Sequence, residues 1–154
     1  MSVPPNIDRF NKTTLLVLDK LYLAFPIPVE ISASKVAMDT LPSDAEYDES
    51  FKAIEPVYWT IEFLRKEGFI EYSEATLDGT TFVQARLTTK SLALLGQVPS
   101  ALEPQVSVSD KIRGVVKGGM KEASAEAVKK VVESLFTNAP TLVSLGQSIA
   151  GTTQ

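Results

Sequence analysis

The dipeptide Asp78-Gly79 is the strongest local constraint on how this chain folds. Asp-Gly between two β-prone segments, here 69–77 and 80–88, favours a two-residue type I′ turn. Counting outward from the turn pairs Leu77 with Thr80, Ala75 with Phe82, Tyr72 with Ala85, Glu71 with Arg86, and Ile70 with Leu87. One face of the hairpin then carries Ile70, Tyr72, Val83, Ala85 and Leu87. The turn residues, the apolar pattern of one face and the opposite charges of Glu71 and Arg86 all indicate a β-hairpin.

Helical periodicity predicts two helices near the N-terminus. The first covers 9–25, with Asn11 as a candidate N-cap. Pro26 ends it, and an extended segment follows. A short second helix is capped by Ser32 or Ser34.

A third helix precedes the hairpin. Asp48 and Ser50 are alternative N-caps, and Gly68 is its C-terminal stop. Proline is unfavourable inside a helix, so the helix either begins near Glu55 or kinks at Pro56.

The C-terminal third is expected to be helical after a connector. A short helix covers 91–95, a connector covers 97–110, and a C-terminal helical region covers 111–154. In that region the helix has an apolar face on one side and a charged face on the other. The apolar face is the candidate oligomer contact, and its residues are Val128, Val131, Val132 and Leu135. This face packs either on the chain's own domain or on a second copy.

The order helix, strand, helix, helix, hairpin, short helix resembles the winged-helix (winged helix-turn-helix) family over residues 9–96. The matching segments are Asn11–Phe25, Pro28–Ile31, Ser34–Leu41, Ser50–Lys66 and then the hairpin as the wing. The passages most similar to the family are Trp59–Ile70 and Arg86–Leu95, the second of which contains Leu-Thr-Thr-Lys. The resemblance implies an α+β fold, with a winged-helix-like domain of three helices plus a wing over 1–96 and appended C-terminal helices.

In DNA-binding members of that family the third helix enters the major groove. The resemblance makes Lys52, Arg65 and Lys66 candidate DNA contacts. The charge distribution disfavours that function, because residues 1–100 hold nine basic and fourteen acidic side chains, a net charge of −5. Each phosphate contact needs a cation, and the region expected to face DNA is the negative one.

An acidic loop precedes the third helix and is the candidate partner-binding segment. Its carboxylates are Asp44, Glu46, Asp48 and Glu49. With Glu55 the spacing partly matches a calcium loop, but Glu49 stands where that loop needs glycine. We therefore expect a solvated acidic loop that offers its charge to a basic protein surface, and we expect no metal site.

The composition disfavours enzymatic function. The chain has no cysteine and no histidine, which removes the cysteine nucleophile and the commonest general base. No catalytic residue and no cofactor is expected, and Trp59 is interpreted as a core residue. The basic run Lys111, Arg113, Lys117 and Lys121 fits a helix packed on its own domain or on a second copy better than a membrane-surface helix.

Two functions remain open. The first is a non-enzymatic protein-interaction or scaffold module with an acidic surface, and the alternative is a DNA-binding transcriptional regulator. No signal peptide is visible at the N-terminus, so a cytoplasmic location is expected and a membrane role is not.

Overall fold

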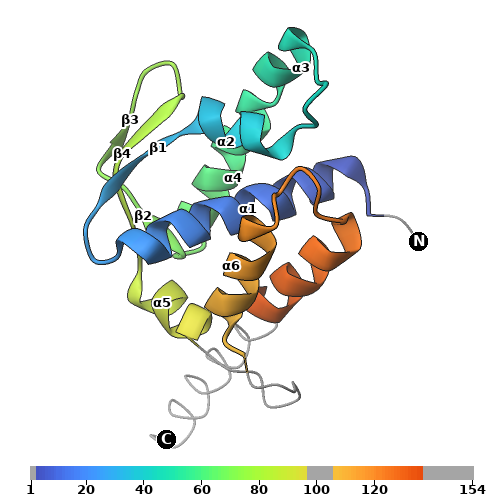
Figure 1. Ribbon diagram of the computed structural model, residues 1–154. Helices are drawn as coiled ribbons and strands as arrows, with labels where there is room; N and C mark the ends of the chain where they lie inside the picture. The colour runs from blue at the N-terminus through green and yellow to red at the C-terminus, as the bar shows by residue number, and fades with distance from the viewer. Residues whose placement is uncertain (1–2, 97–105, 137–154) are drawn as a thin grey trace, which may run out of the picture.

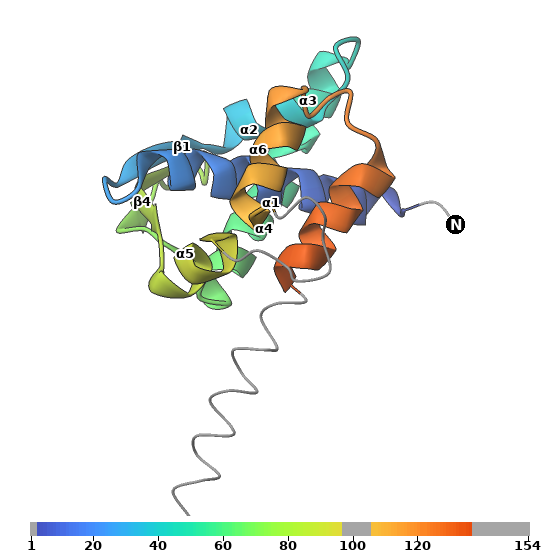
Figure 2. The same ribbon diagram turned by 60° about the horizontal axis from the view of Figure 1, so that its bottom comes forward.

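The longest helix of the described residues forms the centre of an α+β structure. The computed structural model describes residues 3–96 and 106–136. In it, α1 (Pro5–Ala24) lies between α4 (Ile54–Lys66) and α6 (Val108–Lys117), as Figures 1 and 2 show. None of the described helices is both long and apolar enough to cross a membrane.

Helix α1 begins earlier than its periodicity predicts. Pro5 occupies the first turn, where a missing amide hydrogen costs nothing. Asn11 is buried within the helix, so its prediction as an N-cap is wrong. Leu15, Leu18 and Leu21 form the buried stripe, because leucines three residues apart share one helix face.

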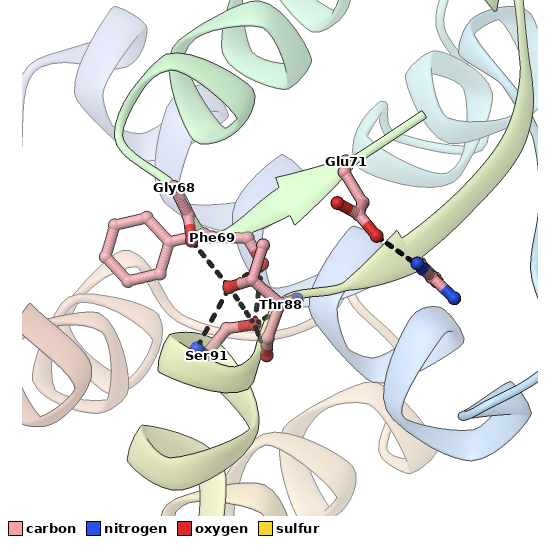
Figure 3. Close-up of polar contacts among 6 residues, drawn as sticks. Gly68, Phe69, Glu71, Thr88 and Ser91 are labelled. Atoms are coloured by element: carbon pink, nitrogen blue, oxygen red, sulfur yellow. Dashed lines mark hydrogen bonds and ion pairs between the residues drawn. The ribbon is translucent and has the colours of Figure 1, made fainter. Parts of the chain in front are cut away.

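A small antiparallel sheet is organised around one strand, β4 (Thr81–Leu87). It pairs with β1 (Val29–Ser32) on one side, and with β2 (Ile70–Glu71) and β3 (Glu74–Ala75) on the other. The predicted hairpin register is confirmed at three pairs, namely Ile70–Leu87, Glu71–Arg86 and Ala75–Phe82. Arg86 Nε donates to Glu71 Oε1, so the predicted charge pair also forms (Figure 3).

A bulge in β4 changes which side chains enter the core. Along β1 the pairing shifts by one residue between Val29–Ala85 and Ile31–Phe82, and Gln84 has a φ of 57°. This bulge moves the alternation of faces by one position. Phe82 and Ala85 are both buried, whereas Val83 is only half-buried. The prediction that Val83 shares the core face with Ala85 is therefore wrong.

The segment between sheet strands β1 and β2 holds three helices. Ser32 caps α2 (Ala33–Thr40), where its Oγ accepts from the Lys35 amide at 3.3 Å. The predicted third helix is two helices, α3 (Tyr47–Lys52) and α4, which meet at Ala53. Pro56 lies in the first turn of α4, so the helix begins near Glu55 rather than kinking.

Gly68 ends α4 as predicted. Its φ is +80°, its amide donates to the Arg65 carbonyl at 3.0 Å, and the Phe69 amide donates to the Leu64 carbonyl at 2.8 Å. This pair of bonds is a Schellman motif, which turns the chain from the helix into β2.

Two hydroxyl groups join the end of α4 to the start of α5 (Thr89–Gly96). Thr88 Oγ1 accepts from the Ser91 amide at 3.3 Å and donates to the Gly68 carbonyl. Ser91 Oγ accepts from the Thr88 amide at 3.1 Å and donates to the Phe69 carbonyl at 2.6 Å (Figure 3). Lys90 Nζ donates to the Glu67 carbonyl at 2.8 Å. The Leu-Thr-Thr-Lys passage thus donates hydrogen bonds to carbonyls of the two residues that directly follow α4.

The C-terminal helices belong to the same hydrophobic core. Helix α6 begins at Val108, inside the stretch predicted as a connector, and Ser107 caps it. Arg113 Nη1 lies 2.9 Å from Oδ2 of Asp19, a buried carboxylate on α1. Residues 125–136 are helical, and Phe136 packs against Phe69 with ring centroids 5.4 Å apart.

The four candidate oligomer residues lie in this shared core. Val128, Val131, Val132 and Leu135 are buried within a single chain. In the structure this apolar face packs on the chain's own domain, which is one of the two predicted alternatives. These side chains are not exposed to a second copy.

Leu135→Ala should lower the free energy of unfolding by about 2–5 kcal/mol, because it opens a cavity in the core. Leu77→Ala is the matched control, since Leu77 is fully exposed and its loss should change stability by less than about 0.5 kcal/mol. Urea denaturation with light scattering measures both quantities. A change of mass in Leu135→Ala at unchanged stability would contradict this assignment.

Ser91→Ala should cost about 1–3 kcal/mol, because it removes an acceptor for one backbone amide and a donor to a buried carbonyl. Ser43→Ala, at an exposed position, is the control. Thermal unfolding followed by circular dichroism distinguishes them, and equal melting temperatures would show that the Ser91 bonds contribute nothing.

Candidate functional site

Exposed apolar side chains gather around a groove between two helices and the hairpin tip. In Figure 1 both α3 and the hairpin tip lie above α1. The groove has a volume of about 820 Å³ and is lined by Phe51, Lys52, Ile54, Glu55, Tyr58, Trp59 and residues 76–80. Trp59 is 57% exposed, Phe51 is 67% exposed, and Leu77 is fully exposed. Large apolar groups left in water together are typical of an interaction surface.

Trp59 lies on the outer face of α4, so its interpretation as a core residue is wrong. The buried stripe of α4 runs through Val57, Ile61 and Leu64, and a residue two positions after Val57 points away from it. Tyr58 is the inner of the two aromatic residues. Its ring lies 5.6 Å from that of Phe82 in β4 and 5.1 Å from that of Trp59. The groove therefore has an aromatic wall supported from the core.

The hairpin tip is built around one carboxylate. Asp78 Oδ1 accepts from Thr76 Oγ1 at 2.6 Å, from Thr80 Oγ1 at 2.8 Å, and from the Thr80 amide at 3.1 Å. These hydrogen bonds lower the pKa of Asp78 below its ordinary value of 3.8. The bond from the Thr76 hydroxyl contributes most, and the bonds from the Thr80 hydroxyl and amide contribute next. These bonds fix the loop that carries Leu77.

The turn itself differs from the predicted type. Gly79 has a φ of +70°, as expected, but Asp78 does not have the positive φ that a type I′ turn requires. The Gly79 amide donates to the Thr76 carbonyl at 2.8 Å, and the Thr76 amide donates to the Thr81 carbonyl at 2.9 Å. The loop therefore has four residues, 77–80, while the strand register is unchanged.

The tip lies directly against α4. A Cβ placed on Gly79 would approach the Tyr58 ring to 3.1 Å, closer than ordinary van der Waals contact. Glycine at position 79 thus allows both the positive φ of the backbone and the close approach of that backbone to the Tyr58 ring.

The predicted partner-binding carboxylates are exposed, and two of them lie on the helix that contributes Phe51 and Lys52 to the groove. Asp48 and Glu49 lie in the first turn of α3, whose last residues, Phe51 and Lys52, line the groove. Asp44 and Glu46 precede that helix and are also exposed. With Glu55 and Asp78 in the lining, the groove has an acidic border.

The candidate DNA-contacting residues are not brought together. Lys52 lines the groove, whereas Lys66 is exposed at the opposite end of α4. Arg65 Nη2 lies 3.2 Å from Glu62 Oε2, and its guanidinium lies 5.6 Å from the centre of the Tyr72 ring. The three cations therefore form no continuous positive strip.

Within residues 3–96 and 106–136, no cluster of three or more Asp, Glu, His or Cys side chains could hold a metal ion. Comparison with known proteins finds no matching family model, no matching curated protein and no matching solved structure. The geometry of the groove is therefore the basis for proposing a function.

Sequence reasoning missed the apolar members of this site. One available signal was Leu77, an apolar residue directly before an Asp-Gly turn, where polar residues are usual. A second was the spacing of Tyr47 and Phe51, which places two aromatic side chains on one face of an acidic helix.

Gly79→Ala should lower the free energy of unfolding by about 1 kcal/mol or more, because alanine resists a positive φ and its Cβ meets Tyr58. Gly114→Ala is the matched control, since it lies within α6 with open space around it and should raise stability by about 0.5–1 kcal/mol. Chemical denaturation should show opposite signs, and equal shifts would contradict the tip geometry.

The carboxyl of Asp78 should titrate below 3.8, and the hydrogen bonds of the tip should stabilise the fold above that pH. Its pKa is lower in the folded chain than in the unfolded chain, so this contribution is lost as pH falls through the folded value. Carboxyl resonances followed by NMR during an acid titration measure it directly. A measured pKa for Asp78 at or above its ordinary value of 3.8 would contradict the arrangement.

Proposed function

We propose that this chain is a non-enzymatic protein-interaction module on a winged-helix-like domain, in which α4 is the third helix and the hairpin is the wing. The element order α1, β1, α2, α4 and hairpin supports this assignment, with α3 as an additional turn of helix in a long acidic connection. The C-terminal helices complete the core of the domain in this proposal. A cytoplasmic location is part of the same proposal.

The observation that carries the proposal is the exposed aromatic groove on the face of α4 and the wing. Trp59, Phe51 and Leu77 would each lose apolar exposed surface on binding a partner. Tryptophan is among the residues that contribute most at protein interfaces. The acidic border adds charge that selects a basic partner surface.

The alternative function, DNA binding by a transcriptional regulator, has less support from the charges. From 50 to 88 the chain has four basic and six acidic residues. Two of the cations, Arg65 and Arg86, already pair with Glu62 and Glu71. Few cations remain to release counterions from a phosphate backbone.

We expect no binding of the full chain to duplex DNA tighter than about 10⁻⁴ M near physiological salt. Fluorescence anisotropy against pooled genomic fragments at about 150 mM salt measures this affinity. Sub-micromolar binding that weakens steeply with salt would make the regulator the better proposal.

The protein-interaction proposal is tested by affinity capture with three forms of the chain: wild type, Leu77→Asp, and Leu23→Asp. Leu23 is a fair control because it is 60% exposed on α1 and does not line the groove. A protein captured by wild type and Leu23→Asp but lost with Leu77→Asp would support the proposal. Capture that is equal for all three would contradict a role for the groove.

A further inference from the structure

We propose that the groove binds a short segment of another protein in which large apolar side chains stand next to lysines or arginines. This inference rests on the proposed function and specifies the chemistry of the partner. It combines the apolar lining of the groove, the sign of its border and the fixed position of the hairpin tip.

The apolar lining sets one requirement on the partner. Ile54 and Tyr58 are half-buried members of the lining, and Phe51, Trp59 and Leu77 are its exposed members. A volume of about 820 Å³ falls in the range of sites that enclose a drug-sized molecule, which corresponds to a few side chains. A segment with large apolar side chains would therefore fill the groove and remove these exposed groups from water.

The charges set the second requirement. Lys52 is outnumbered in the lining by Glu55 and Asp78. Asp48 lies one helical turn before Lys52 on α3, and Glu49 is its neighbour, so both add negative charge at the border. A negative border attracts lysine or arginine and repels phosphate, which favours a basic peptide over a nucleic acid.

The hairpin tip makes the groove available without rearrangement. Asp78 holds the loop through Thr76 and Thr80, and the backbone at Gly79 lies against Tyr58. The held loop carries Leu77, which lines the same groove as Trp59. Because little of the site needs to be ordered on binding, a short segment can bind with measurable affinity.

Trp59 provides a direct readout, because it is the one tryptophan in the sequence. The probe is a fluorescein-labelled synthetic peptide of about twelve residues, built only from leucine, lysine and glycine. Two matched peptides replace every leucine by serine or every lysine by glutamate. An unlabelled copy of each peptide is used for the fluorescence of Trp59.

The leucine–lysine peptide should shift Trp59 emission to shorter wavelength and raise fluorescein anisotropy with a saturable curve. Each matched peptide should bind at least about tenfold more weakly, the equivalent of 1.4 kcal/mol. Leu77→Ser should weaken binding to a similar degree and Leu23→Ser should not. Leu77 is fully exposed, so its replacement removes no buried contact.

Four results would overturn the inference. They are absence of binding, equal binding of the glutamate peptide, binding that Leu77→Ser leaves unchanged, and a dimer of the full chain that Leu77→Ser abolishes. The last would identify a second copy as the occupant. The proposed function is tested separately by the affinity capture and the DNA titration, so a failed peptide test rejects only the partner chemistry if a protein is still captured by wild type and lost with Leu77→Asp.

Discussion

The pairing of β4 with β1, β2 and β3, the other strands in the described part of the chain, is the constraint on which the rest of this structure depends. Because of the bulge at Gln84, Phe82 enters the core instead of Val83. The Phe82 ring then lies 5.6 Å from that of Tyr58 on α4 and 4.9 Å from that of Tyr72. The Phe82 side chain thereby connects the hairpin to α4, the helix that contributes Tyr58 and Trp59 to the groove.

The groove follows from that attachment. Once Tyr58 is held by Phe82, its neighbour Trp59 is directed outward, and the hairpin tip lies across the Tyr58 ring at Gly79. The C-terminal helices contribute from the other side of α1, where their apolar face completes the core. The exposed apolar surface of the groove is thus maintained by buried contacts rather than by contacts among the exposed residues themselves.

Local chemistry made the hairpin register and the stop at Gly68 predictable, since both depend on neighbouring residues. The positive φ of Gln84 was not predictable, because it reflects how β4 meets β1 and β2 at once. The carboxylates at Asp48 and Glu49 were identified as a candidate site from composition. Their apolar neighbours were not, because periodicity shows that a face is apolar without showing what covers it. For the same reason, the sequence left open whether the apolar face that contains Val128 packs on the chain's own domain or on a second copy.

The most direct test of this account is an NMR titration of the isotopically labelled full chain with the leucine–lysine peptide and, separately, with duplex DNA. If the groove binds the peptide, the peptide should perturb backbone amides from Tyr47 to Trp59 and from Thr76 to Thr80, which form the groove and its border. Duplex DNA should perturb few signals at the same concentration. Large DNA-induced shifts centred on Lys66 and Arg65, with the groove signals unchanged by peptide, would contradict it.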